Sequence, residues 1–165
     1  MDQEELRAVQ APIKEQYRKA PESALVTLRV EGELGAGVSC SVRTGKALIE
    51  AGLHPATGGD GSFACSGDML LEALVACAGV TMRSVATSLG IAVAGTVRAE
   101  GDLDFRGTLA VDRTARVGFT AIRLSFDLES VADDEQIATL LRLTERYCVV
   151  FQTLVSPPEL TVRRV

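Results

Sequence analysis

The most apolar stretch of the chain predicts a long, buried helix. Residues 68–89 (DMLLEALVACAGVTMRSVATSL) carry apolar side chains on most helical faces, as expected of a helix covered nearly all round. Ser66 or Asp68 can cap its start, and Gly90 stands where a terminating glycine belongs. About 22 residues span roughly 33 Å, which is long for so small a domain.

A second helix is predicted over residues 134–154. Asp133, with Gln136 three residues on, resembles a capping box, and the prolines after Ser156 end the segment. Apolar positions recur at three- and four-residue spacing, which is typical of a helix with one buried face. The predicted stripe consists of Ile137, Leu140, Leu141, Thr144, Tyr147, Cys148, Phe151 and Leu154.

Alternating apolar and polar residues predict strands on either side of these helices. The predicted strands are 24–31, 37–44, 92–105, 119–129 and a final 159–165, while 106–118 is either a loop or a strand with turns. Glycines at 32, 35 and 37 can supply the turn of a hairpin between the first two strands. In the fourth, the inward positions are Ile122, Leu124, Phe126 and Leu128.

The order of these elements favours one α+β domain over residues 1–165. Residues 3–19 form an amphipathic helix interrupted near Pro12, so 1–21 is predicted as an N-terminal helical extension and 22–165 as the core. Strands that come in runs favour antiparallel sheets over a parallel sheet. The longest predicted loop, 52–67, is rich in glycine and leads into the apolar helix.

Composition and charge narrow the possible functions. The chain is 47% hydrophobic, with a mean hydropathy of +0.19, so part of its surface is expected to be buried against a second copy. A net charge of −5 argues against a nucleic-acid partner. We expect no membrane span, since no apolar run approaches about 18 residues, and no signal peptide, since the start is acidic. The expected location is the cytoplasm, where thiols stay reduced.

Few residues are candidates for catalysis, metal binding or phosphate binding. His54 is the only histidine, and the four cysteines are far apart in sequence, so we expect neither a His-paired nucleophile nor a metal site. The glycine-rich loop lacks a phosphate-binding motif, and its glycines can simply let the chain turn. Cys40 and Cys65 are interpreted as structural or incidental.

Cys77 and Cys148 both fall on predicted inward helix faces. Two packed helices can bring facing cysteines to the Cα separation of a disulfide, about 4.4–6.8 Å. Such a pair could cycle between dithiol and disulfide. The alternative is that both are small core residues, as free cysteines often are.

A reactive Cys77 requires something that stabilises its thiolate. A cysteine in mid-helix gains little from its own helix N-terminus, so we expect a cation, either Arg29 or Arg43. Asp68 or Glu72 could orient such an arginine, although each also suits a plain capping or surface role. Arg83 and Arg146 are interpreted as solvated helix charges.

These residues together resemble the OsmC/Ohr family of thiol-dependent peroxidases. The resemblance runs through the loop Gly58-Gly59-Asp60-Gly61, the segment from Ser66 to Cys77 (SGDMLLEALVAC), and the segment from Tyr147 to Leu154 (YCVVFQTL). It covers about residues 22–165. The family pattern has Pro-Glu before the cysteine helix, with the Glu ten residues ahead of the peroxidatic cysteine. This chain has Gly67 at that position, and its nearest carboxylate is Asp68. The family pattern also has a proline after the second cysteine, where this chain has Val149.

The resemblance implies an intertwined homodimer whose antiparallel sheets wrap two long central helices, with active sites at the subunit interface. It implies that Cys77 is the peroxidatic thiol and Cys148 the resolving thiol, with Arg43, Arg29 and Asp68 as candidates for activating the peroxidatic one. The substrates would be organic hydroperoxides, and an external dithiol of lipoyl type would reset the pair without a bound cofactor. The alternatives are a dimer that binds a small hydrophobic ligand in its interface pocket and a purely structural dimer.

Overall fold

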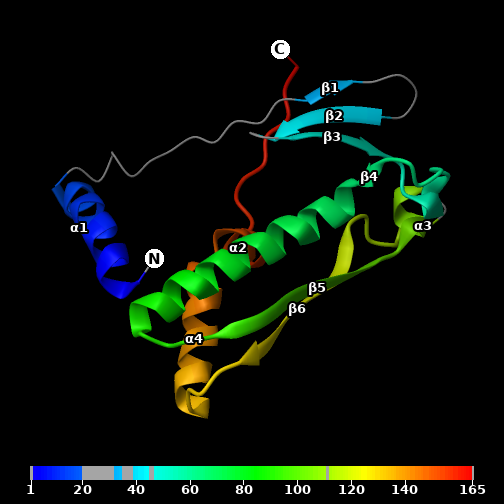
Figure 1. The fold of residues 1–165 in the computed structure, drawn as a ribbon. Helices are drawn as coiled ribbons and strands as arrows, with labels where there is room; N and C mark the ends of the chain where they lie inside the picture. The colour runs from blue at the N-terminus through cyan, green and yellow to red at the C-terminus, as the bar shows by residue number, and fades with distance from the viewer. Residues whose placement is uncertain (1, 20–31, 35–38, 45–46, 111, 165) are drawn as a thin grey trace. The chain divides into compact units, whose positions relative to one another are not determined.

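The computed structural model describes residues 2–19, 32–34, 39–44, 47–110 and 112–164 (Figure 1). The chain divides into two compact units. The first contains Met1–Glu15, Ala73–Arg98 and Leu124–Val165, and the second contains Gln16–Glu72 and Ala99–Arg123. The expectation that residues 1–165 form one domain stays a prediction.

The first unit is built on helices. They are α1 (Gln3–Lys19, its first part), α2 (Ser66–Leu89, from Ala73 on), α4 (Asp134–Tyr147) and α5 (Val149–Val155). Its buried core joins Met82 and Ala86 of α2 to Leu140 of α4 and to Val93. Four partly buried side chains pack against this core: Val85, Phe126, Leu128 and Leu141. The α2–α4 contact therefore organises this unit.

Local sequence signals mark the C-terminal end of α2 and the start of α4. Gly90 ends α2 with φ of +70°, a left-handed conformation that favours glycine, and the N–H of Ile91 then bonds to the Ala86 carbonyl. Asp133 and Gln136 form the predicted capping box at the start of α4, each side chain accepting from the other residue's backbone N–H at 2.8 and 3.1 Å. These predictions are confirmed.

The second unit holds a four-stranded sheet. Its strands are β1 (Gly32–Leu34), β2 (Ser39–Thr44), β3 (Ala47–Gly52) and β4 (Ala64–Cys65), in that order. The first three pair antiparallel, and β4 pairs parallel to β3. Between β3 and β4 the loop contains a short 3-10 helix, η2 (Pro55–Thr57).

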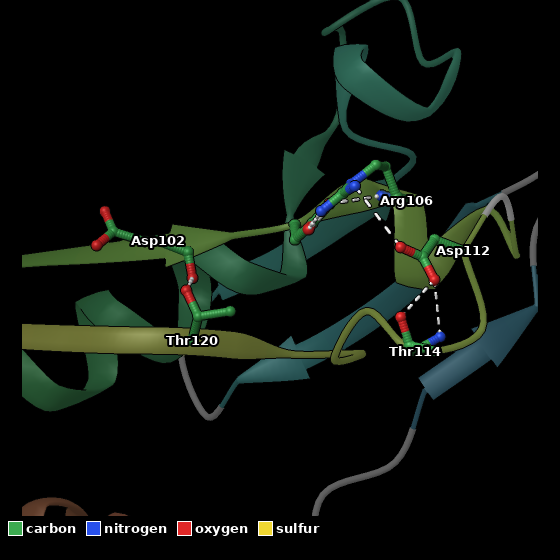
Figure 2. A network of polar contacts seen from close by, with 6 residues as sticks. Asp102, Arg106, Asp112, Thr114 and Thr120 are labelled. Carbon is green, nitrogen blue, oxygen red and sulfur yellow. Dashed lines mark hydrogen bonds and ion pairs between the residues drawn. The ribbon is translucent and has the colours of Figure 1, made fainter.

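Strands β5 (Ala94–Leu103) and β6 (Phe119–Glu129) form a two-stranded ribbon. The Thr120 hydroxyl donates to the Asp102 carbonyl at 3.1 Å (Figure 2), and Gly95 lies against the backbone of Asp127. The two strands therefore run in opposite directions. Half-buried and exposed residues alternate along most of β6, and the predicted inward positions are half-buried.

Several element predictions need correction. Gly32 lies in β1 rather than in a turn, β3 and β4 were not expected, and α1 continues through Pro12. A short helix, α3 (Phe105–Thr108), follows β5. Residues 159–164 form no strand, and the strand predicted over 24–31 lies outside the described residues. The predicted helix 134–154 breaks at Cys148, and Tyr147 is exposed.

The premise that no apolar run of the chain is long enough to span a membrane needs correction. Among the described residues, α2 is long and apolar enough to do so. Only 22% of its most apolar 18-residue window is buried within this one chain.

The buried core predicts that two leucines contribute very differently to the free energy of unfolding. Leu140 is 0% exposed and Leu160 is 84% exposed. Leu140→Ala should lower the free energy of unfolding by about 3 kcal/mol, because it leaves a cavity between α2 and α4. Leu160→Ala should change it by less than about 0.5 kcal/mol. Urea denaturation of the two variants checks this, and equal losses would contradict the described core.

Candidate functional site

The site forms where one residue separates two helices. Cys148 has φ of −74° and ψ of 108°, which is extended rather than helical. Its N–H still bonds to the Thr144 carbonyl and ends α4, while its carbonyl accepts the first bond of α5, from the Gln152 N–H, both at 2.9 Å. The N–H groups of residues 149–151 precede that first bond. They are the donors that a helix start leaves without a partner inside its own helix.

Two of these N–H groups lower the pKa of Cys77, the half-buried cysteine in the middle of α2. Burial raises the pKa of the Cys77 thiol, because a thiolate loses hydration there. Hydrogen bonds from the backbone N–H groups of Val150 and Val149 lower this pKa. The side chains of Cys148 and Thr81 add two more. Together the bonds outweigh burial, so the pKa of Cys77 lies below that of an ordinary cysteine.

The pKa of the neighbouring Cys148 thiol is shifted in the opposite direction, above its ordinary value. Its side chain is 0% exposed, and this burial raises the pKa of its thiol. A bond from the Phe151 N–H partly offsets the effect, but the Cys77 sulfur beside it opposes a second negative charge. The pair therefore combines one thiol that ionises readily with one that stays protonated. Both thiols are free.

This arrangement adds a source of stabilisation for the Cys77 thiolate that the sequence did not indicate. The helix N-terminus that matters is that of α5, which the predicted continuous helix concealed. A proline at the first position is a common signal for a helix start, and Val149 stands there instead. The contributions of Val149, Val150 and Thr81 were therefore missed. Only Thr81 had a sequence signal, since it lies four residues after Cys77 on the same helix.

Of the predicted activating residues, only Asp68 and Glu72 have described side chains. Arg29 lies outside the described residues, and the side chain of Arg43, in β2, is likewise not described. Asp68 is exposed in the first turn of α2, nine residues from Cys77 and so roughly 13 Å away along the helix axis. Glu72 is exposed on the same helix. Activation through these residues stays a prediction.

The two helix arginines have local partners. Arg83 is not merely solvated, because its guanidinium donates to the Val93 carbonyl at 2.5 Å and ties α2 to the start of β5. Arg146 lies in the last turn of α4, with its guanidinium carbon 5.7 Å from the centre of the Tyr147 ring. A cation there also suits the C-terminal end of a helix.

The glycine-rich loop of the second unit has a structural organisation. His54 Nδ1 accepts from the Ala56 N–H at 3.0 Å and caps η2, while its ring stacks on Phe105 with 4.9 Å between centroids. A Cβ on Gly59 would lie 1.8 Å from the Leu53 carbonyl oxygen, so only glycine fits there. The observed contacts of His54 are those of a loop residue, as predicted.

A polar network in the same unit organises α3 and the loop after it (Figure 2). The Arg106 guanidinium makes a two-nitrogen contact with Asp104 and holds the pKa of that carboxyl below its usual range. It also lies 3.6 Å from Asp112, which accepts from the N–H and hydroxyl of Thr114. The described partners of Arg106, Asp104 and Asp112, lie at the start of α3 and in the loop after it. Arg106 therefore stabilises the local structure of this segment.

Comparison with known proteins identifies the family. The family model for OsmC-like proteins matches residues 59–163, so the chain belongs to the OsmC-like family. OsmC-like proteins are soluble, so α2 is a helix of a soluble protein rather than a membrane span. No curated protein matches the sequence.

Solved structures agree on the fold. An OsmC-like protein from Mycoplasma pneumoniae has a TM-score of 0.67 at 16% identity, over 80% of this chain and 89% of that one. An organic hydroperoxide resistance protein OsmC from Legionella pneumophila has a TM-score of 0.60 at 16% identity, over 81% and 92%. The organic hydroperoxide resistance protein OhrB of Bacillus subtilis has a TM-score of 0.51 at 16% identity, over 81% and 94%. The α+β, OsmC-like fold predicted from the sequence is confirmed.

The hydrogen bond from Thr81 can be tested alone. Thr81→Val keeps the side-chain shape and removes the hydroxyl donor, so the pKa of Cys77 should rise and its alkylation by iodoacetamide near pH 7 should slow. Thr87→Val is the matched control, because the Thr87 hydroxyl bonds to the Arg83 carbonyl on the same helix. The pH dependence of alkylation, read at Cys77 by peptide mass spectrometry, gives the result. Equal shifts in both variants would contradict the assignment.

Proposed function

We propose that this protein is a thiol peroxidase that reduces organic hydroperoxides through a cycle of Cys77 and Cys148. The observation that carries the proposal is the contrast between the two thiols. Cys77 is partly open and receives backbone N–H donors, whereas Cys148 beside it is fully buried. The first is suited to attack as a thiolate, and the second is suited to wait as a protonated thiol.

The cycle balances in two steps. The Cys77 thiolate attacks one oxygen of the hydroperoxide, an S–O bond forms and the O–O bond breaks. The leaving alkoxide takes a proton and departs as an alcohol, while the sulfur, oxidised by two electrons, becomes a sulfenic acid. The Cys148 thiol then loses its proton and attacks that sulfur. The S–S bond forms, the S–O bond breaks, and the hydroxide takes a proton and leaves as water.

Neither of these two steps needs a cofactor. An external dithiol must then reduce the disulfide to restore the two thiols. Thiol–disulfide exchange transfers two electrons from the external dithiol, which is itself oxidised to a disulfide. The resemblance favours a lipoyl-type dithiol and a reducing, cytoplasmic location. Either Arg43 or Arg29, oriented by Asp68, would assist by stabilising the thiolate and the departing oxygen.

The surroundings of Cys77 support an organic substrate. Val80 is 73% exposed, Val149 is 71% exposed and Tyr147 is 59% exposed. These apolar side chains stand next to Cys77 or Cys148 in sequence or along α2. A hydroperoxide with a hydrocarbon body can bury apolar area against them, whereas hydrogen peroxide cannot. Two of the solved relatives are described as organic hydroperoxide resistance proteins.

Peroxide titration tests the cycle directly. One equivalent of an organic hydroperoxide added to reduced protein should convert Cys77 and Cys148 to one disulfide before any other cysteine changes. Cys148→Ser should instead leave Cys77 oxidised to sulfenic and then sulfinic acid. Cys77→Ser should abolish peroxide consumption, and Cys65→Ser is the control that should retain it.

Non-reducing peptide mass spectrometry separates the outcomes. A reduced Cys77 in the Cys148→Ser protein after peroxide treatment would overturn the mechanism. A full set of reduced cysteines in the wild type, with a hydrophobic compound recovered from the denatured protein, would favour the ligand-binding alternative instead.

We also propose that the protein is a homodimer in which α2 is central. The helix is apolar, yet within this chain its most apolar window is largely unburied. Exposed apolar surface of this kind marks a protein–protein contact in soluble proteins. A second copy laid along α2 would cover Val80 and enclose the surroundings of Cys77. The site would then be completed by the partner chain.

One substitution should break that dimer. Val80→Glu places a charge on the exposed face of α2, so the assembly should dissociate to a monomer of half the mass. Val131→Glu is the matched control, since Val131 is 99% exposed between β6 and α4. Sedimentation equilibrium gives both masses. A monomeric wild type, or a Val80→Glu protein that stays dimeric, would contradict the proposal.

A further inference from the structure

His54 holds the glycine-rich loop between β3 and β4 through both its ring and its backbone. Its ring nitrogen Nδ1 accepts from the Ala56 N–H at 3.0 Å and so caps η2. Its carbonyl oxygen accepts from the Thr57 N–H at 2.8 Å, from the Thr57 hydroxyl at 2.9 Å and from the Gly59 N–H at 3.2 Å. The conformation of this loop, residues 53–61, therefore depends on the position of His54.

The same ring fastens the loop to α3. It stacks on Phe105, the first residue of that helix, with 4.9 Å between the ring centroids and 18° between the ring planes. Both residues are half-buried, and aromatic pairs at such separations attract each other. Because turning the imidazole moves Nδ1 and tilts the ring plane, one orientation makes the cap and the stack together, and a turned ring loses both.

The cap requires a neutral imidazole. The Ala56 N–H can donate only to a ring nitrogen that carries no proton, so the proton of the neutral ring lies on Nε2. A second proton makes both ring nitrogens donors, and two N–H groups would then face each other across the 3.0 Å between Nδ1 and the Ala56 nitrogen. Histidine ordinarily changes its charge between about pH 5 and 8. The cap is therefore present at the upper end of that range and lost as the pH falls.

The elements around His54 carry other charged groups, which must be kept apart from its response. They are Glu50 of β3, Asp60 of the loop, and Asp104, Arg106 and Asp112 at α3 and after it. Hydrogen bonds from Ser62, Arg106 and Thr114 hold the pKa values of the three aspartates below their usual range. These aspartates therefore keep their charge while a histidine gains its proton.

We propose that His54 is a pH-sensitive latch, which fastens the glycine-rich loop to α3 while the ring is neutral and releases the loop when the ring is protonated. The backbone pair of Gly52 with Cys65 closes the base of this loop, so release frees the loop and leaves the sheet in place. The latch involves neither Cys77 nor Cys148. It goes beyond the proposed function and stands or fails without it.

Nuclear magnetic resonance can follow the latch directly, since His54 is the only histidine and its ring signals are unambiguous. At about pH 8 the ring nitrogen shifts should show the neutral form with its proton on Nε2. As the pH falls to about 5, the amide signals of Ala56 and Gly59 and those of α3 should move with the midpoint of the ring. Exchange of the Ala56 amide, corrected for the intrinsic effect of pH, should become several-fold faster. A proton on Nδ1 at the higher pH, or a ring that titrates while these signals stay fixed, would overturn the proposal.

His54→Asn is the matched control. The backbone of His54 is extended, with φ of −62° and ψ of 143°, and asparagine favours this position before a helix. Its side-chain oxygen can accept from the N–H two residues on, and it takes up no proton in this range. The Ala56 amide should therefore stay protected at both pH values. The variant keeps every nearby carboxylate, so a loop that still opens on acidification would assign the response to those groups and overturn the proposal.

Phe105→Leu tests the connection to α3. Leucine keeps an apolar side chain at the first position of α3 and removes the ring on which the imidazole stacks. The Ala56 amide should still respond to pH, because the cap remains, whereas the amides of α3 should no longer follow the His54 midpoint. If the amides of α3 moved as much as in the wild type, the stack would not be the fastening and the latch would be wrong.

Discussion

A thiolate inside a protein depends on hydrogen-bond donors that replace the water it has lost, and the donors here come from a single interruption in a helix. Cys148 ends α4 with its N–H and begins α5 with its carbonyl, so the two following N–H groups are free to reach Cys77. These donors are neutral. Stabilisation by neutral backbone dipoles is less sensitive to salt than stabilisation by the full charge of an arginine would be.

The packing of α2 on α4 is what brings the two parts of the site together. The buried positions of α2 are Leu74, Ala78, Met82 and Ala86, and the last two lie in one core with Leu140. Along α4 and onward, the buried positions continue through Thr144 to Cys148. Cys77 is next to this face rather than on it. It is therefore close enough to meet α5 and open enough to meet a substrate.

The apolar character of α2 has consequences beyond this contact. Its composition satisfies the length and hydropathy of a membrane span, although OsmC-like proteins are soluble. The same excess accounts for the positive mean hydropathy of the chain. A second copy is the cover that we propose. In that arrangement the residues that shield Cys77 from water are also those that hold the dimer, so assembly and reactivity would be linked.

The sequence by itself determined the fold class, the C-terminal end of α2, the start of α4 and the two candidate cysteines. Each of these depends on local chemistry: glycine at a left-handed position, a capping box, and apolar spacing along one face. The tertiary structure alone decided how Cys77 is stabilised. Residues 148–151 have the apolar spacing of a continuous helix, and Val149 carries no start signal, so periodicity could not locate the break. Backbone N–H groups are the same in every residue but proline, and only their placement across a helix–helix contact makes them donors to a particular sulfur.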